Sequence, residues 1–166
     1  MKQSKHNIYY SPKEVRTILE RSIDTALDGL KGYCNDPVSD FTRCRKLPAR
    51  TLIECIMSFS NYSSIGELSH FFVGHGEMPS ASALSQRRQL LDPDIFKRIN
   101  NLFVSAFDDH TTINGYHILA QDGSDVNIPF MDDKTKTEKH DAKSFCQYHV
   151  NALYDCLNKV FYDWSI

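Results

Sequence analysis

Long apolar runs are missing from this sequence of 166 residues. A membrane-spanning helix needs roughly 20 consecutive apolar residues, and no segment approaches that length. The N-terminus is polar and leads into no apolar stretch, so we expect no secretory signal. The sequence therefore predicts a protein that acts in the cytoplasm without a membrane partner.

A strong charge of one sign is also missing, since 19 Lys and Arg residues stand against 21 Asp and Glu residues. The net charge of −2 argues against a protein that coats nucleic acid through bulk charge. The five cysteines are odd in number and irregularly spaced, so they predict no disulfide framework and favour a reducing compartment. Hydrophobic residues still make up 41% of the chain, which is enough to bury a core.

Helical periodicity dominates residues 1–110. Ser11 to Glu14 predicts a capping box with Pro12 at the first helical position, and Gly32 suits the end of that helix. Four further helices are expected: one opened by a capping box at Ser64, one capped by Ser80, one starting at Asp92 and Pro93, and one near Pro48. The inner face of the helix near Pro48 should carry Leu52, Ile53, Ile56, Met57 and Ser60.

The pattern changes to that of strands in residues 111–166. A short strand from Tyr116 should end near Ala120, and the charged residues 131–144 indicate a solvated loop. Loose alternation from Cys146 to Cys156, with Tyr148, Val150, Ala152 and Tyr154 on one face, predicts a strand, and a tight turn at 157–159 leads into another at 160–166. The expected fold class is α+β, with a helical unit over 1–110 and the beginning of a sheet over 111–166.

Asp122 follows the first predicted strand and precedes Gly123. A carboxylate at a strand end suits a metal-dependent phosphoryl-transfer site, in which divalent ions held by carboxylates activate the attacking oxygen and stabilise the leaving one. The same Asp-Gly pair is a hairpin-turn signal, and pattern alone favours that second interpretation.

Several short segments occur in an order that resembles the N-terminal part of transposases of the insertion-sequence-four family. The most specific are Leu-Ala-x-Asp-Gly-Ser at 119–124 and Asn-Ala-Leu-Tyr-Asp at 151–155. The others are Arg-Lys-Leu-Pro at 45–48, Gly-Glu-Leu-x-x-Phe-Phe at 66–72 and Ser-x-Ser-Ala-x-x-Gln-x-Arg at 80–88. The resemblance runs from about residue 40 to Ile166.

The resemblance implies a catalytic domain with a ribonuclease H-like fold and an active site of two aspartates and a glutamate. The first aspartate matches Asp122, which would hold Mg²⁺ or Mn²⁺. The other two would fall beyond Ile166, so the expected structure is a helical bundle followed by the first three strands of an incomplete ribonuclease H-like sheet. We expect such a truncated DDE transposase to be inactive alone.

In that family the N-terminal helical region contacts the ends of the transposon. Phosphate contacts are therefore expected from the bunched basic residues Arg43, Arg45, Lys46, Arg50, Arg87 and Arg88. Charge alone predicts an ordinary solvated face equally well. The partners implied are transposon-end DNA on the nucleoid, a second copy of the chain paired through its apolar last strand, and intact transposase.

Other chemistry-bearing residues favour plain structural roles. Cys146, His149 and Cys156 offer three soft ligands, but their spacing suits core or surface positions better than a zinc site. Asp155 and Asp163 are expected in turns or on the surface, and Asp125 should face the opposite side from Asp122 if the strand continues. Two rival functions remain: a non-enzymatic DNA-binding fragment that inhibits intact transposase, and an unrelated small interaction domain.

Overall fold

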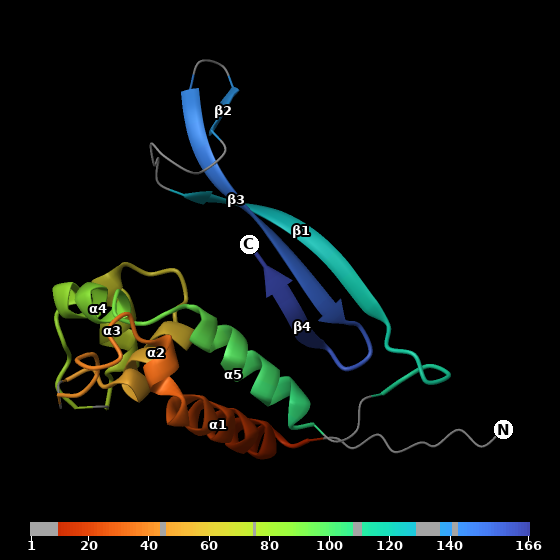
Figure 1. Cartoon of the computed structure of the whole chain (residues 1–166), viewed down its shortest axis with the longest axis horizontal. Helices are drawn as coiled ribbons and strands as arrows, with labels where there is room; N and C mark the ends of the chain where they lie inside the picture. The colour runs from red at the N-terminus through yellow and green to blue at the C-terminus, as the bar shows by residue number, and fades with distance from the viewer. Residues whose placement is uncertain (1–9, 44–45, 75, 108–110, 129–136, 141–142) are drawn as a thin grey trace. The chain divides into compact units, whose positions relative to one another are not determined.

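The computed structural model describes residues 10–43, 46–74, 76–107, 111–128, 137–140 and 143–166 (Figure 1). Five α-helices precede a sheet of antiparallel strands, which confirms the predicted α+β class. Tyr10–Phe103 forms one compact unit, and the described residues of Val104–Ile166 belong to a second. Each unit is considered by itself below.

The first helix, α1 (Pro12–Asp28), begins as predicted. The Ser11 hydroxyl accepts the backbone N–H of Glu14, and the Glu14 carboxylate accepts the backbone N–H of Ser11, which completes the capping box. The predicted end at Gly32 is wrong, because Gly29 already caps the helix with its N–H on the carbonyl of Ala26. Gly32 lies in the short 3₁₀ helix η1 (Leu30–Tyr33) that follows.

The next helix, α2 (Ala49–Met57), starts beside Pro48 as expected and buries Leu52 and Ile53 completely. Met57 and Ser60 do not lie on its inner face, since both are exposed. The other buried positions of this helix are Ala49 and Cys55.

A loop leads from α2 into α3 (Ser64–Phe71), and the predicted cap at Ser64 is wrong by one residue. The Ser63 hydroxyl accepts the N–H of Gly66, while the Glu67 carboxylate reaches back to the loop before the helix. There its Oε1 accepts the backbone N–H groups of Ser60, Asn61 and Tyr62 at 2.9, 2.8 and 2.7 Å. The Ser63 hydroxyl therefore caps the helix, while the buried Glu67 carboxylate holds the loop before it.

Two more helices complete this unit: α4 (Ala81–Arg88), capped by Ser80 as predicted, and α5 (Asp94–Ser105), whose first N–H is accepted by Asp92. Inner faces of the five helices and the segments between them share one hydrophobic core. Its buried members are Ile23, Ala26, Leu47, Leu52, Ile53, Cys55, Leu68, Phe72, Leu84, Leu91, Ile95 and Ile99.

The sheet of the second unit is built around the long strand β3 (Lys143–Asp155), as Figure 1 shows. β1 (Leu119–Ile128) runs antiparallel along one edge of β3. β2 (Thr137–His140) and β4 (Val160–Ser165) pair with different ends of β3, also antiparallel. The turn at 156–159 joins β3 to β4, as the sequence predicts.

Three expectations about the strands are wrong. The first strand does not end near Ala120, because β1 continues without a break from Leu119 to Ile128, paired with β3 throughout. No hairpin turn forms at Asp122 and Gly123. Residues 137–140 form a strand within the stretch predicted as a loop, so the sheet has four strands among the described residues rather than three. Pairing with β3 overrides the turn and loop propensities of these segments.

Within the described ranges of the chain, no helix is long and apolar enough to cross a membrane.

Candidate functional site

Asp122 lies in the interior of β1, opposite Ala152 of β3, and not at the strand end predicted for it. Its side chain is exposed, and its Oδ1 accepts the backbone N–H of Gly123 at 2.9 Å. A carboxylate so placed is open to a cation from solvent, and oxygen is the ligand type that Mg²⁺ and Mn²⁺ prefer.

The two faces of the β1–β3 pair differ in polarity, because side chains alternate along each strand. The polar face pairs amides and charged groups directly across the strands: Gln147 donates to Asn127 at 2.8 Å, and His149 bonds Asp125 at 2.8 Å. The opposite, apolar face carries Val126, Tyr148, Val150, Ala152 and Tyr154, and the predicted grouping of the last four is confirmed. Asp122 belongs to this apolar face.

The His149–Asp125 pair is the feature of the sheet that sequence reasoning missed. The Nδ1 atom of His149 lies 2.8 Å from Oδ1 of Asp125, and both side chains are more than half exposed. The ring also lies against Gly123, where an added Cβ atom would come within 2.8 Å of Nε2. A glycine inside a strand pattern was the available signal, since it often marks a close approach.

Neither Asp125 nor Asp163 completes a metal site with Asp122. Asp125 is three residues away on the same strand and bonds His149 on the polar face. Asp163 pairs opposite Leu153, one register position from the Ala152 pair, so it also lies on the polar face. Across the residues that the structure describes, no three His, Cys, Asp or Glu side chains come close enough to hold a metal ion.

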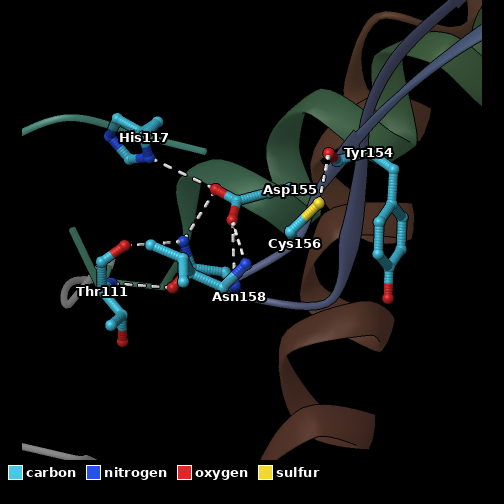
Figure 2. Close-up of polar contacts among 7 residues, drawn as sticks. Thr111, His117, Tyr154, Asp155, Cys156 and Asn158 are labelled. Atoms are coloured by element: carbon cyan, nitrogen blue, oxygen red, sulfur yellow. Dashed lines mark hydrogen bonds and ion pairs between the residues drawn. The ribbon is translucent and has the colours of Figure 1, made fainter. Parts of the chain in front are cut away.

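Asp155 organises the turn between β3 and β4 (Figure 2). Only 1% of the residue is exposed, and its carboxylate accepts the backbone N–H groups of Leu157 and Asn158 at 3.0 and 2.9 Å. The Asn158 amide and Nδ1 of His117 bond its other oxygen, and Asn158 in turn exchanges hydrogen bonds with the Thr111 backbone. The turn role expected for Asp155 is confirmed, and the residue is buried.

These contacts decide the ionisation of Asp155. Burial by itself would raise the pKa of this carboxyl, but the hydrogen bonds from Asn158, His117 and Leu157 outweigh burial and hold the pKa below its ordinary value of 3.8. A carboxylate satisfied by so many donors is a structural group rather than a metal ligand.

The three soft side chains considered for zinc are kept apart by the sheet. Cys146 is buried near the start of the β1–β3 ladder, opposite Ile128, whereas Cys156 lies in the turn at the other end of β3. His149 is three residues from Cys146, so its ring lies on the other face. The structural roles predicted for these residues are therefore consistent with their positions.

Three of the basic residues predicted to contact DNA form ion pairs, hydrogen bonds or ring contacts with other residues of the helical unit. Lys46 forms an ion pair with Glu77, and Arg50 pairs with both Asp24 and Glu54. Arg87 is half-buried, donates from Nε to the Leu47 carbonyl at 3.0 Å, and stacks on the Phe41 ring at 4.2 Å from its centroid.

Arg43 and Arg88 are exposed, and Arg45 lies outside the described residues. A pocket of about 380 Å³ has Thr42, Arg43, Gln86 and Arg87 among its lining residues. Arginine is the residue type that most often contacts phosphate through paired hydrogen bonds.

In comparisons with known proteins, no protein-family model, no curated protein and no solved structure matches this chain.

Proposed function

We propose that this chain is part of a metal-dependent DNA transposase, in which the helical unit holds DNA through phosphates and Asp122 supplies one carboxylate to a divalent metal ion. Mg²⁺ or Mn²⁺ in such a site polarises the phosphate oxygens and activates the attacking group. The chain's own contribution at Asp122 is one exposed oxygen ligand.

One observation carries this proposal. The two segments that most specifically resemble the insertion-sequence-four transposases are neighbours in the sheet, paired residue by residue from Leu119–Asp155 to Gly123–Asn151. Segments separated by more than twenty residues in sequence thus form a single structural unit, and Asp122 is exposed on it. A shared unit gives these motifs a common reason to occur together. The ribonuclease H-like fold of the whole catalytic domain is part of the proposal.

Binding to DNA is tested with labelled duplexes taken from the flanks of the gene, where terminal inverted repeats are expected, against scrambled duplexes. We expect affinity to fall linearly with the logarithm of salt concentration, because bound phosphates release counterions. Arg88→Ala should weaken binding and reduce that slope by about 0.9 if Arg88 contacts one phosphate. The matched control is Arg16→Ala, an exposed arginine on α1 that is ion-paired with Glu20 and lies outside the basic clusters.

The metal arm of the test uses Mn²⁺, which broadens the NMR signals of amides close to its binding site. Titration should broaden the amides of β1 around Asp122, and Asp122→Asn should abolish this effect while Asp163→Asn leaves it intact. Salt-sensitive DNA binding with no broadening at Asp122 would favour the rival function, a DNA-binding protein without a metal site. Absence of both effects would reject the proposal.

A further inference from the structure

Two pockets of the helical unit adjoin along α4. The smaller, of about 380 Å³, has Arg43 in its lining, and the larger, of about 530 Å³, has Lys46 and Ser80. Gln86 and Arg87 line both pockets. The two pockets therefore share a wall, which is built from the last turn of α4.

The Arg87 guanidinium is fixed in this wall by one contact on each side. Its Nε donates to the carbonyl of Leu47, which lines the larger pocket, at 3.0 Å. Its Cζ lies 4.2 Å from the ring centre of Phe41, which lines the smaller pocket. Phe41 has a φ angle of 54°, a left-handed conformation that bulky residues seldom adopt. The ring therefore reaches the guanidinium through a strained backbone, and a positive charge lies between the two pockets.

The lining of the smaller pocket favours an anion. Arg43 is exposed and adds a second guanidinium group to the lining residues. One carboxylate, that of Asp40, also belongs to the lining. Asp40 is only 8% exposed, and its Oδ2 accepts the backbone N–H of Asp36 at 2.8 Å, so this oxygen is engaged within its own turn. The two arginines outnumber the single carboxylate.

Lys46 gives the larger pocket a cation that an exposed carboxylate already contacts. It forms an ion pair with Glu77, and their side chains are 53% and 77% exposed. Exposed pairs of this kind are weak, so a phosphate can replace Glu77 at little cost. Ser80 and Ala83 lie at the start of α4 and line the same pocket, so the positive end of the helix dipole adds to the attraction.

We propose that the two pockets form one groove that holds a DNA strand by neighbouring phosphates, one beside Arg43 and one beside Lys46, with the Arg87 charge between them. A small free anion would fill one pocket, whereas adjoining cationic pockets suit a ligand whose charges repeat. Each strand of DNA carries one negative charge per about 3.4 Å of the helix axis. Glu77 occupies Lys46 until DNA replaces it. This inference rests on the proposed function, in which the helical unit holds DNA through phosphates.

The sharpest test removes the competitor of DNA. Glu77→Gln in the full chain should tighten binding of the labelled flank duplex about two- to fivefold at low salt, which is the fold-change equivalent to an exposed ion pair. Glu20→Gln is the matched control, because it removes the same charge from another exposed ion pair, that with Arg16 on α1. The gain should vanish when Glu77→Gln is combined with Lys46→Ala, since no cation is then released.

Salt dependence tests the two phosphate positions separately. Arg43→Ala and Lys46→Ala should each weaken binding and reduce the slope of log affinity against log salt by about 0.9. Arg87→Lys keeps the charge but loses the planar fork, so it should weaken binding with an unchanged slope. Scrambled duplexes should show the same changes as flank duplexes, because phosphate contacts carry no sequence information.

The outcomes distinguish this groove from the proposed function. Salt-sensitive binding that is equal in the native chain, Glu77→Gln and Arg43→Ala would overturn the groove and leave DNA binding elsewhere on the helical unit. A gain in Glu20→Gln as large as that in Glu77→Gln would also overturn it, since net charge alone would explain the effect. Absence of DNA binding by the native chain at low salt would overturn both.

Discussion

Glu67 is a carboxylate that stabilises a loop rather than a reaction. It is 5% exposed, and one oxygen accepts the backbone N–H groups of Ser60, Asn61 and Tyr62. Burial alone would raise the pKa of Glu67, but these three bonds outweigh burial and hold the pKa below its ordinary value of 4.5. The folded state therefore favours the ionised form.

The direction of this pKa shift predicts how stability changes with pH. Because the pKa of Glu67 is lower in the folded than in the unfolded protein, its stabilisation is fully present above about pH 4.5 and is lost as the pH falls through the folded value. Glu67→Gln should lower the thermal midpoint at neutral pH. The midpoint of this variant should also fall less steeply than that of the native protein as the pH is lowered. Circular dichroism melts over this pH range measure both effects.

Glu20→Gln provides the control for that experiment. Glu20 forms an exposed ion pair with Arg16 on α1, and such pairs contribute little to stability. If the two variants had the same melting curves at every pH, the loop contacts of Glu67 would be energetically unimportant.

Asp155 gives a second prediction at the scale of the residue. Asp155→Asn removes the charge that Leu157 and Asn158 donate to, and an amide can accept from fewer of the four donors. We expect a local loss of about 1–3 kcal/mol, as for other buried donors left without a full partner. Hydrogen exchange at the Leu157 and Asn158 amides should be faster, whereas Asp163→Asn should leave both rates unchanged.

At the scale of the element, helix starts in this chain are decided by short side-chain contacts. Ser11, Ser63 and Ser80 each accept an N–H from the third residue of the helix that follows. Such caps satisfy donors that the helix itself cannot, and they depend on residues only three positions apart.

Ser63 and Ser64 allow a direct test of where α3 begins. Ser63→Ala should lower the free energy of unfolding by about 1 kcal/mol because the Gly66 N–H loses its acceptor. Ser64→Ala should cost nothing or stabilise slightly, since alanine is the better helix former. Urea unfolding of both variants compares them, and a larger loss for Ser64 would place the cap where the sequence alone suggested.

At the scale of the whole molecule, the described residues bring a single exposed carboxylate to the apolar face at Asp122 and no group of three metal ligands. Two divalent ions close together need several carboxylates to offset their mutual repulsion. We therefore expect the 166-residue chain to leave supercoiled plasmid DNA intact in the presence of Mg²⁺ or Mn²⁺.

Asp122→Asn and the native chain should give the same background in this nicking assay. Nicking by the native chain that disappears in Asp122→Asn would contradict the expectation and would show that the metal site is more complete than one carboxylate. Nicking retained in Asp122→Asn would point to a contaminating nuclease.

The parts of this molecule that the sequence predicted are those fixed by neighbours in the chain. Four predicted features depend on contacts within a few residues: the Ser11 capping box, the Ser80 cap, the Asp92 contact before α5 and the turn before β4. Local propensity and periodicity describe such contacts directly, which is why the α+β order of the elements could be predicted.

The candidate site depends instead on contacts between distant residues. The sequence alone predicts a turn at Gly123. In the structure Gly123 pairs with β3, and the His149 ring of that strand fills the space beside it, so Asp122 also lies within the strand. Arg50 and Glu54 are spaced to pair along one helix, but the pair of Arg50 with Asp24 forms only because the fold brings together residues 26 positions apart. The sequence by itself determined the elements and their order. Only the tertiary structure decided which face of the sheet Asp122 occupies and which charged side chains are paired. The reason is that strand register and long-range ion pairs are set by the packing of segments far apart in the chain.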